Sequence, residues 1–146
     1  MKKIIGYTSG VFDMFHIGHL HLLKKAKKNC DYLIVGVNTD QLVSSYKEKT
    51  PIIPLEHRVE IVSALSCVDE VVTLNHRDKI KTFHDIRYDI MFVGDDWKGS
   101  EIFSKVEIEL GKFGAEVKYF EYTKKVSSTK FTSILQGIYD SETADQ

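Results

Sequence analysis

Residues 4–19 read IIGYTSGVFDMFHIGH, and this stretch decides the fold. Its apolar start, Ile4 to Thr8, predicts a short strand, and a glycine-containing loop follows at once. Beyond the loop, apolar residues recur at helical spacing, at Leu20, Leu22, Leu23 and Ala26. A strand that turns through such a loop directly into a helix predicts the opening of a βαβ unit.

The rest of the chain alternates in the same way. Further strands are predicted at residues 32–37, 70–74, 90–93 and 116–120. Helices are predicted at residues 58–65, 77–86 and 103–113, with a last one from about residue 127, and a polar loop is predicted up to about Pro54. Strands separated by helices imply an α/β fold: a Rossmann-like parallel five-stranded sheet, order 3-2-1-4-5, with helices on both faces.

The composition is typical of an ordinary globular protein, with 42% hydrophobic and 28% charged residues and a net charge of −1. This balance favours neither nucleic acid nor a membrane as a partner, and no apolar run approaches the ~20 residues that span a bilayer. One domain is predicted over residues 1–139, with a polar tail at 140–146. Cys30 and Cys67 match no metal or redox spacing, which favours packing thiols in a reducing cytoplasm.

Three segments with unusual chemistry each follow a predicted strand: Ser9–His19, Gly94–Gly99 and Tyr122–Thr129. Open parallel sheets bind ligands beyond the carboxyl ends of their strands, where the strand order reverses. The sequence therefore predicts a ligand site at this edge.

The first of these segments ends in two histidines, His16 and His19, at the mouth of a predicted helix. Gly18 lets a ligand approach the backbone there, and the free N–H groups of a helix start favour phosphate. Both imidazoles can reach one point and donate hydrogen bonds to the oxygens of a phosphorus under attack. Two alternatives are a helix cap with two exposed histidines and a zinc site completed by His21 or Asp13.

Residues 10–13 (GVFD) followed by residues 16–19 (HIGH) resemble the signature of the cytidylyltransferase branch of the HxGH nucleotidyltransferase superfamily. Residues 93–99 (VGDDWKG) resemble the segment that contacts cytosine in bacterial glycerol-3-phosphate cytidylyltransferases. Residues 126–130 (VSSTK) are similar to the family's serine-rich run, which forms a nest for the β- and γ-phosphates. The resemblance extends from about residue 3 to residue 134, and the compact chain favours the glycerol-phosphate type.

The resemblance implies roles for individual residues. Its catalytic residues are His16, His19, Lys47 and Lys49, although the sequence does not separate the two lysines. Its nucleotide-binding residues are Ser9, Gly10, Val11, Phe12, His16, Gly18, His19, Gly94, Asp95, Asp96, Trp97, Tyr122, Ser127, Ser128 and Thr129. Its acceptor-binding residues are Asp13, Arg58 and Arg77, with Arg58 as a phosphate contact.

Two departures from the family pattern concern the acceptor. Tyr122 stands where many relatives carry arginine, and Arg77 occupies the place of an acceptor-side tryptophan. A nearby lysine does not reproduce the bidentate fork of an arginine. The acceptor is therefore the part of the reaction that the sequence specifies least.

The reaction implied is transfer of a cytidylyl group from CTP to sn-glycerol 3-phosphate, giving CDP-glycerol and pyrophosphate. Mg²⁺ is expected with CTP, and no resident metal is implied. Alternatives are another phosphorylated alcohol as acceptor, adenylyl transfer from ATP, and a nucleotide-binding module without catalysis. The resemblance also implies a homodimer and a product that feeds a wall or capsule polymer.

Overall fold

The computed structural model describes residues 2–47, 49–121 and 134–138. A single parallel sheet has the order β3-β2-β1-β4-β5, which confirms the predicted topology. Its strands are β1 (Ile5–Gly10), β2 (Tyr32–Asn38), β3 (Glu70–Leu74), β4 (Ile90–Gly94) and β5 (Glu116–Phe120). The order reverses between β1 and β4, so the predicted site lies at this switch point.

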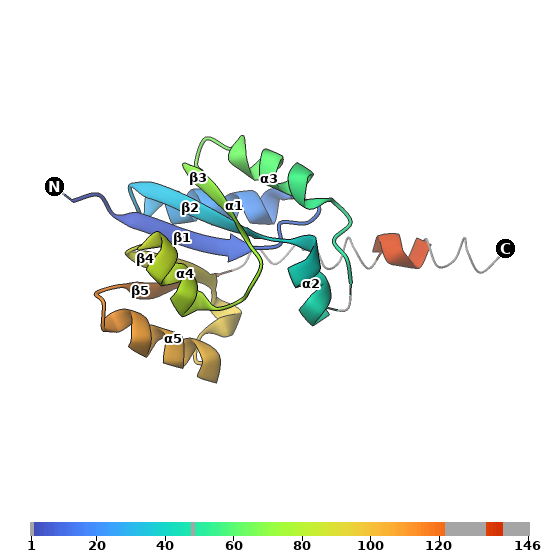
Figure 1. Ribbon diagram of the computed structural model, residues 1–146. Helices are drawn as coiled ribbons and strands as arrows, with labels where there is room; N and C mark the ends of the chain where they lie inside the picture. Colours follow the sequence, from blue (N-terminus) through green and yellow to red (C-terminus); the bar gives the residue numbers. More distant parts are fainter. Residues whose placement is uncertain (1, 48, 122–133, 139–146) are drawn as a thin grey trace.

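Helices cover both faces of the sheet (Figure 1). The helices are α1 (Ile17–Lys28), α2 (Asp40–Lys47), α3 (Leu55–Ser63), α4 (Lys79–Ile86) and α5 (Glu101–Gly111), with a 3₁₀ turn η1 (Asp95–Trp97). Side chains of α1 and α3 pack on one face of the sheet, and those of α2, α4 and α5 pack on the other.

Helix α2 corrects the prediction of a continuous polar loop between β2 and Pro54. The Thr39 hydroxyl accepts the N–H of Leu42 and caps the helix. Leu42 and Tyr46 then pack with the core on the α2-α4-α5 face, and Val43 is also buried. This burial stabilises a helix whose remaining residues are polar. This apolar stripe is too short for its period to stand out in the sequence.

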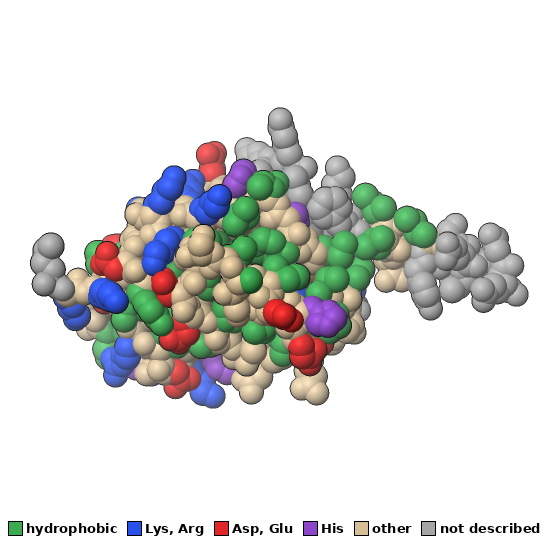
Figure 2. Space-filling view, turned by 90° about the horizontal axis from the view of Figure 1, so that it is seen from above, with side chains coloured by type: hydrophobic (Ala, Val, Ile, Leu, Met, Phe, Trp, Pro, Cys, Tyr) green, Lys and Arg blue, Asp and Glu red, His purple; other side chains and the backbone are tan. Residues whose placement is uncertain are grey.

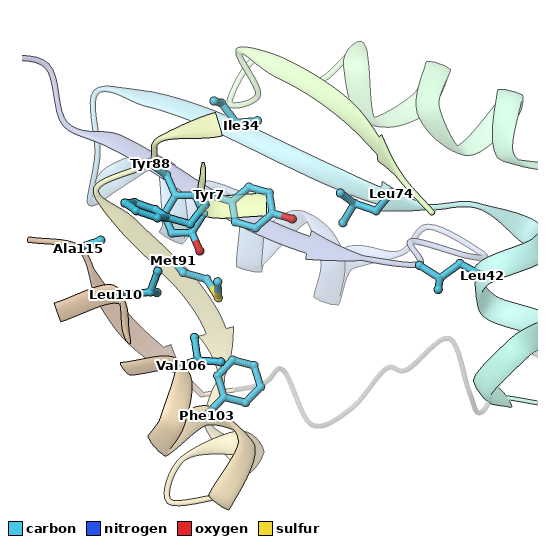
Figure 3. Packing of buried hydrophobic residues seen from close by; sticks show 11 residues of the cluster. Tyr7, Ile34, Leu42, Leu74, Tyr88, Met91, Phe103, Val106, Leu110 and Ala115 are labelled. Atoms are coloured by element: carbon cyan, nitrogen blue, oxygen red, sulfur yellow. The ribbon is translucent and has the colours of Figure 1, made fainter. Parts of the chain in front are cut away.

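The buried core on the α2-α4-α5 face is built around Tyr7 and Tyr88, whose rings stack 4.9 Å apart (Figure 3). Glycine is required at position 36 because a Cβ there would lie 2.8 Å from the Tyr7 hydroxyl and 2.8 Å from a methyl group of Leu74. Burial raises the pKa of Tyr7 to about 12, with Ser9 and Thr82 opposing the shift, so the phenol is neutral at physiological pH.

The amino edge of the sheet is closed by carboxylates. Asp31 accepts the N–H of Ile4, Asp89 accepts that of Ile5, and Asp69 accepts that of Leu33. These bonds satisfy backbone donors at the strand starts. Chemistry-bearing side chains instead collect at the opposite, carboxyl edge.

Helix α1 runs back from the carboxyl edge, so its basic last turn, with Lys25, Lys27 and Lys28, lies toward the amino edge. Figure 2 shows Lys and Arg side chains of this face gathered mainly in the half that carries the amino terminus. These lysines are therefore remote from the mouth of α1. Within the described residues, no helix has the length and apolar character needed to cross a bilayer.

Candidate active site

His16 and His19 form a stacked pair at the first turn of α1. Their ring centroids lie 4.0 Å apart, and the ring planes differ by 22°. His16 Nδ1 accepts the N–H of Gly18 at 3.0 Å, and His19 Nδ1 accepts the N–H of His16 at 3.2 Å. This reciprocal capping box means that the pair caps the helix and, in doing so, fixes the position of both rings.

These hydrogen bonds determine which ring nitrogen carries the proton. A nitrogen that accepts a backbone N–H has no proton of its own, so in each neutral imidazole Nε2 is the donor. Burial lowers the pKa of His19 to about 4, helped by the charge of His16, and burial also lowers the pKa of His16. Both rings are neutral at pH 7, and each carries its single proton on Nε2, as a donor of the kind suited to phosphate oxygens.

An aromatic cradle supports the pair. The rings of Phe12 and Phe15 lie 5.5 and 5.2 Å from the His19 ring, and Phe12 is buried. Phe12 and Met14 have φ values of 55° and 51°, a left-handed conformation that costs on the order of 1–3 kcal/mol for each non-glycine residue. The loop is therefore held in a strained conformation that keeps Phe12 beneath the histidines.

Arg58 corrects a prediction, since its side chain is only 1% exposed. Its Nε donates to the Ile53 carbonyl, one terminal nitrogen donates to the carbonyls of Val11 and Asn38, and the other donates to Asp40. The guanidinium therefore links the loop before α1 to the end of β2. It has a structural role here, because its side chain is buried and these carbonyls and the carboxylate accept from four of its five N–H groups.

Asp13 also has a structural role in place of the predicted acceptor contact. The residue is 6% exposed, and its two carboxylate oxygens accept the N–H groups of Ile52 and Ile53 at 2.8 and 2.9 Å. Through these bonds Asp13 fixes the segment before α3 to the loop before α1. Both corrected residues are charged groups next to the site that hold its backbone in place.

The Gly94–Trp97 segment leaves β4 beside β1, as the predicted cytosine contact requires. Gly94 is buried at the strand end, Asp95 and Asp96 are exposed, and Trp97 is 37% exposed with its ring 5.5 Å from that of Phe103. Backbone and carboxylate groups are thus presented at the switch point. Their contact with a base stays a prediction.

Lys79 is a site residue that the sequence analysis missed. It is the first residue of α4, and its Nζ lies 3.4 Å from the hydroxyl of Ser9 at the end of β1. Burial lowers its pKa, and the charge of Arg77 adds to the shift. Nothing in its local sequence separates it from other helix-start lysines, because only the packing of α4 across the sheet brings it to β1.

Arg77 and the end of α2 meet over Tyr46. The guanidinium carbon of Arg77 lies 4.2 Å from the Tyr46 ring centroid, and Lys47 Nζ lies 5.9 Å from the same centroid. Lys47 and Lys49 are exposed, so the structure leaves open which of them reaches a triphosphate. Arg77 thus lies on the Lys79 side of the site, away from the base-side segment.

Part of the predicted site lies outside the described residues: Tyr122, Ser127, Ser128 and Thr129. Within residues 2–47, 49–121 and 134–138, no three His, Cys, Asp or Glu side chains are grouped as metal ligands. Of the predicted residues that are described, the structure brings the histidine pair, Ser9 and Gly94 to the ends of β1 and β4.

Residues 7–134 match the family described as cytidylyltransferase-like. The chain belongs to this family. As a cytidylyltransferase-like protein it is a nucleotidyltransferase, and the stacked histidines at the mouth of α1 lie inside the matched region.

Relatives of this cytidylyltransferase-like chain include two named glycerol-3-phosphate cytidylyltransferase. That of Bacillus subtilis (strain 168) is 36% identical over 139 residues, which cover 94% of this chain and 100% of the relative. That of Bacillus spizizenii is 39% identical over 131 residues, covering 89% and 94%. Bifunctional protein HldE of Yersinia pestis (strain Pestoides F) is 38% identical over 138 residues, or 94% of this chain but 28% of that protein.

Among solved structures, the lipopolysaccharide core biosynthesis protein from Thermoplasma volcanium superposes with a TM-score of 0.70 at 32% identity. The match covers 86% of the cytidylyltransferase-like chain and 100% of that protein. Pantoate-beta-alanine ligase from Francisella tularensis has a TM-score of 0.60 at 17% identity, which shows a shared fold alone.

Proposed function

We propose that the protein transfers a cytidylyl group from CTP to sn-glycerol 3-phosphate, forming CDP-glycerol and releasing pyrophosphate. The observation that carries the proposal is the locked, neutral His16–His19 pair, which presents two Nε2–H donors at the start of a helix. The choice of nucleotide and acceptor is supported by two relatives with this activity in their names, at 36% and 39% identity.

In the proposed reaction, an oxygen of the acceptor phosphate attacks the α-phosphorus of CTP in line with the leaving pyrophosphate. A new phosphorus–oxygen bond forms as the bond to the β-phosphate bridging oxygen breaks. The attacking phosphate is already ionised at neutral pH, since its second pKa is about 6, so no strong general base is required. Each histidine donates to a non-bridging α-phosphate oxygen, whose charge develops in the transition state.

We assign different cationic side chains to the two substrates, CTP and the acceptor. Lys47 or Lys49 neutralises the triphosphate, which enters with Mg²⁺. By the resemblance alone, we assign the terminal phosphates to residues 127–129, which lie outside the described residues. On the acceptor side we assign Lys79, whose half-buried ammonium beside Ser9 is a charged donor at the carboxyl edge. Lys79 takes over the contact first expected of Arg58.

The remaining expectations belong to the same proposal. The protein acts in the cytoplasm as a homodimer, and its product feeds a wall or capsule polymer. Ser9, Gly10, Val11, Phe12 and Gly18 line the nucleotide from the β1–α1 side, and Gly94–Trp97 contact the base. A nucleotide contact of Tyr122 rests on the resemblance alone, because this residue lies outside the described residues.

The decisive experiment measures pyrophosphate release with CTP or ATP against a panel of phosphorylated alcohols. We expect CTP with glycerol 3-phosphate to give the highest kcat/KM. Higher turnover with ATP would contradict the cytosine assignment, and higher turnover with another acceptor would contradict the glycerol assignment. Tight CTP binding without pyrophosphate release across the panel would show a non-catalytic nucleotide-binding module.

A further inference from the structure

Three cations from two segments lie at the carboxyl edge, and we name them the cation cluster: Lys47, Arg77 and Lys79. Arg77 and Lys47 both lie over the Tyr46 ring, at 4.2 and 5.9 Å from its centroid. Arg77 is also close enough to Lys79 for its charge to lower the pKa of that lysine. Arg77 therefore shares the Tyr46 ring with Lys47 and also acts on the charge of Lys79.

The Tyr46 ring is held in place by the scaffold. Its hydroxyl accepts a hydrogen bond from the Asn38 side chain at 3.0 Å, and the Asn38 backbone carbonyl accepts one from Arg58. The ring also packs against the core on the α2-α4-α5 face. Arg77 thus stacks on an aromatic surface whose orientation is fixed before any acceptor arrives.

The carboxylates of the two segments are engaged elsewhere. Asp40 forms an ion pair with Arg58, and an oxygen of Asp78 accepts the N–H groups of Ile80 and Lys81 at the start of α4. Within the described part of these segments, both carboxylates therefore make these contacts with groups outside the cation cluster. An incoming acceptor meets the guanidinium of Arg77 and the ammonium group of Lys79.

We propose that the stack of Arg77 on Tyr46 is a specificity-determining pair that selects phosphate esters of uncharged polyols against those of cationic alcohols. The inference rests on the proposed function and adds its acceptor class. Proteins recognise quaternary ammonium groups through open aromatic faces. Here a guanidinium lies over the aromatic face, so a trimethylammonium or ammonium group finds no ring to bind and meets like charge. A hydroxyl-bearing chain accepts hydrogen bonds from the same guanidinium.

The test compares acceptors within each variant, so that general damage to the protein cancels. The quantity measured is the ratio of kcat/KM for glycerol 3-phosphate to that for choline phosphate, with CTP saturating. In the unaltered protein we expect the ratio to be large. Arg77→Ala uncovers the Tyr46 ring and removes one cation, so we expect the ratio to fall about 10-fold or more, consistent with the strength of cation–π contacts at partly desolvated sites.

A double variant separates the two parts of the pair. In an Arg77→Ala background, Tyr46→Leu removes the uncovered ring, and we expect the gain with choline phosphate to be lost. Arg77→Lys retains a positive charge and should keep most of the original preference. Arg87→Ala is the matched control because Arg87 also stacks on an aromatic ring, Phe83, at 5.4 Å, but at the opposite end of α4.

The outcomes distinguish this inference from the function on which it rests. Turnover with an unchanged acceptor ratio in Arg77→Ala would overturn the specificity pair and leave the transferase intact. Equal use of choline phosphate and glycerol 3-phosphate by the unaltered protein would also overturn it. Absence of pyrophosphate release with every acceptor would overturn the proposed function itself.

Discussion

The two halves of the site are built differently. On the nucleotide side, His16 and His19 are three residues apart and are locked by each other's backbone and by adjacent phenylalanines. On the acceptor side, Lys79 contacts Ser9, which lies 70 residues earlier in the chain. Arg77 likewise contacts Tyr46 of helix α2. The two histidines to which we assign the phosphoryl chemistry therefore come from one short segment. The recognition that varies with the acceptor is assembled from separate segments.

The sharpest test of this contrast removes the nucleotide-side donors. His16→Ala and His19→Ala should each lower kcat by ~100-fold or more, because positioned donors to developing charge have effects of this size. Pyrophosphate release at saturating substrates measures the effect. His84→Ala is a suitable control, since His84 contacts Phe113 on the far side of the molecule. Turnover within a few-fold of the unaltered protein would remove the histidines from the mechanism.

A change on the acceptor side should act on a different kinetic constant. Lys79→Met removes a charged hydrogen-bond donor, which typically contributes ~1.5–3 kcal/mol, so KM for the acceptor should rise roughly 10- to 100-fold. KM for CTP should change little. Lys81→Met alters an exposed lysine in the first turn of the same helix and provides the control. A rise in KM for CTP of equal size would contradict the division into two halves.

Arg58 joins the halves, because its guanidinium donates to Val11 on the nucleotide side and to Asn38 and Asp40 on the acceptor side. Arg58→Lys keeps the charge but loses the planar fork, leaving buried acceptors unsatisfied at a cost of about 1–3 kcal/mol. We expect a fall in Tm of about 2–12 °C, since each kcal/mol shifts Tm by about 2–4 °C in a chain of this size.

Thermal unfolding measures this effect, and Arg87→Lys is the control because Arg87 is exposed and stacks on Phe83 alone among the contacts described. If Arg58→Lys kept the original Tm and raised only the KM for the acceptor, Arg58 would contact the acceptor and its structural role would be wrong.

The smallest expected effect concerns the ionisation of the His19 ring, which should not change near neutral pH. Burial lowers the pKa of His19 to about 4 from 6.5, so its ring should stay neutral through the range in which an exposed histidine titrates. The unfolded chain takes up a proton as the pH falls through 6.5 and the folded chain does not, so the His19 contribution to stability is full above pH 6.5 and declines toward pH 4. NMR titration of the imidazole resonances checks this, and a midpoint near 6.5 would contradict it.

The strands, and the position of the histidine pair just after the first strand, could be predicted from sequence because their signals are local. Strand periodicity, glycine loops and the HIGH tetrapeptide each lie within a few residues. Helix α2 was missed because its stability comes from packing. Lys79 and Tyr46 were missed because their positions depend on how α4 and α2 cross the sheet.

Arg58 and Asp13 show the opposite error. Both residue types suit a phosphate or a polyol, and both occur in segments that resemble the family's site. The local sequence does not reveal that their charges are satisfied internally. Asp13 accepts from N–H groups 39 and 40 residues away, and Arg58 donates to partners that include Val11, 47 residues away. Burial decides between the two roles, and burial is a tertiary property.

The uncharged state of the histidine pair has a thermodynamic consequence for nucleotide capture. Because each ring is neutral, with its single proton on Nε2 and its Nδ1 committed to a backbone donor, the pair can donate to the triphosphate without changing its ionisation. Heats of CTP binding measured by calorimetry near pH 7.5 should then be nearly the same in buffers with different enthalpies of protonation. The enzyme would capture its nucleotide with almost no exchange of protons with the surrounding solution.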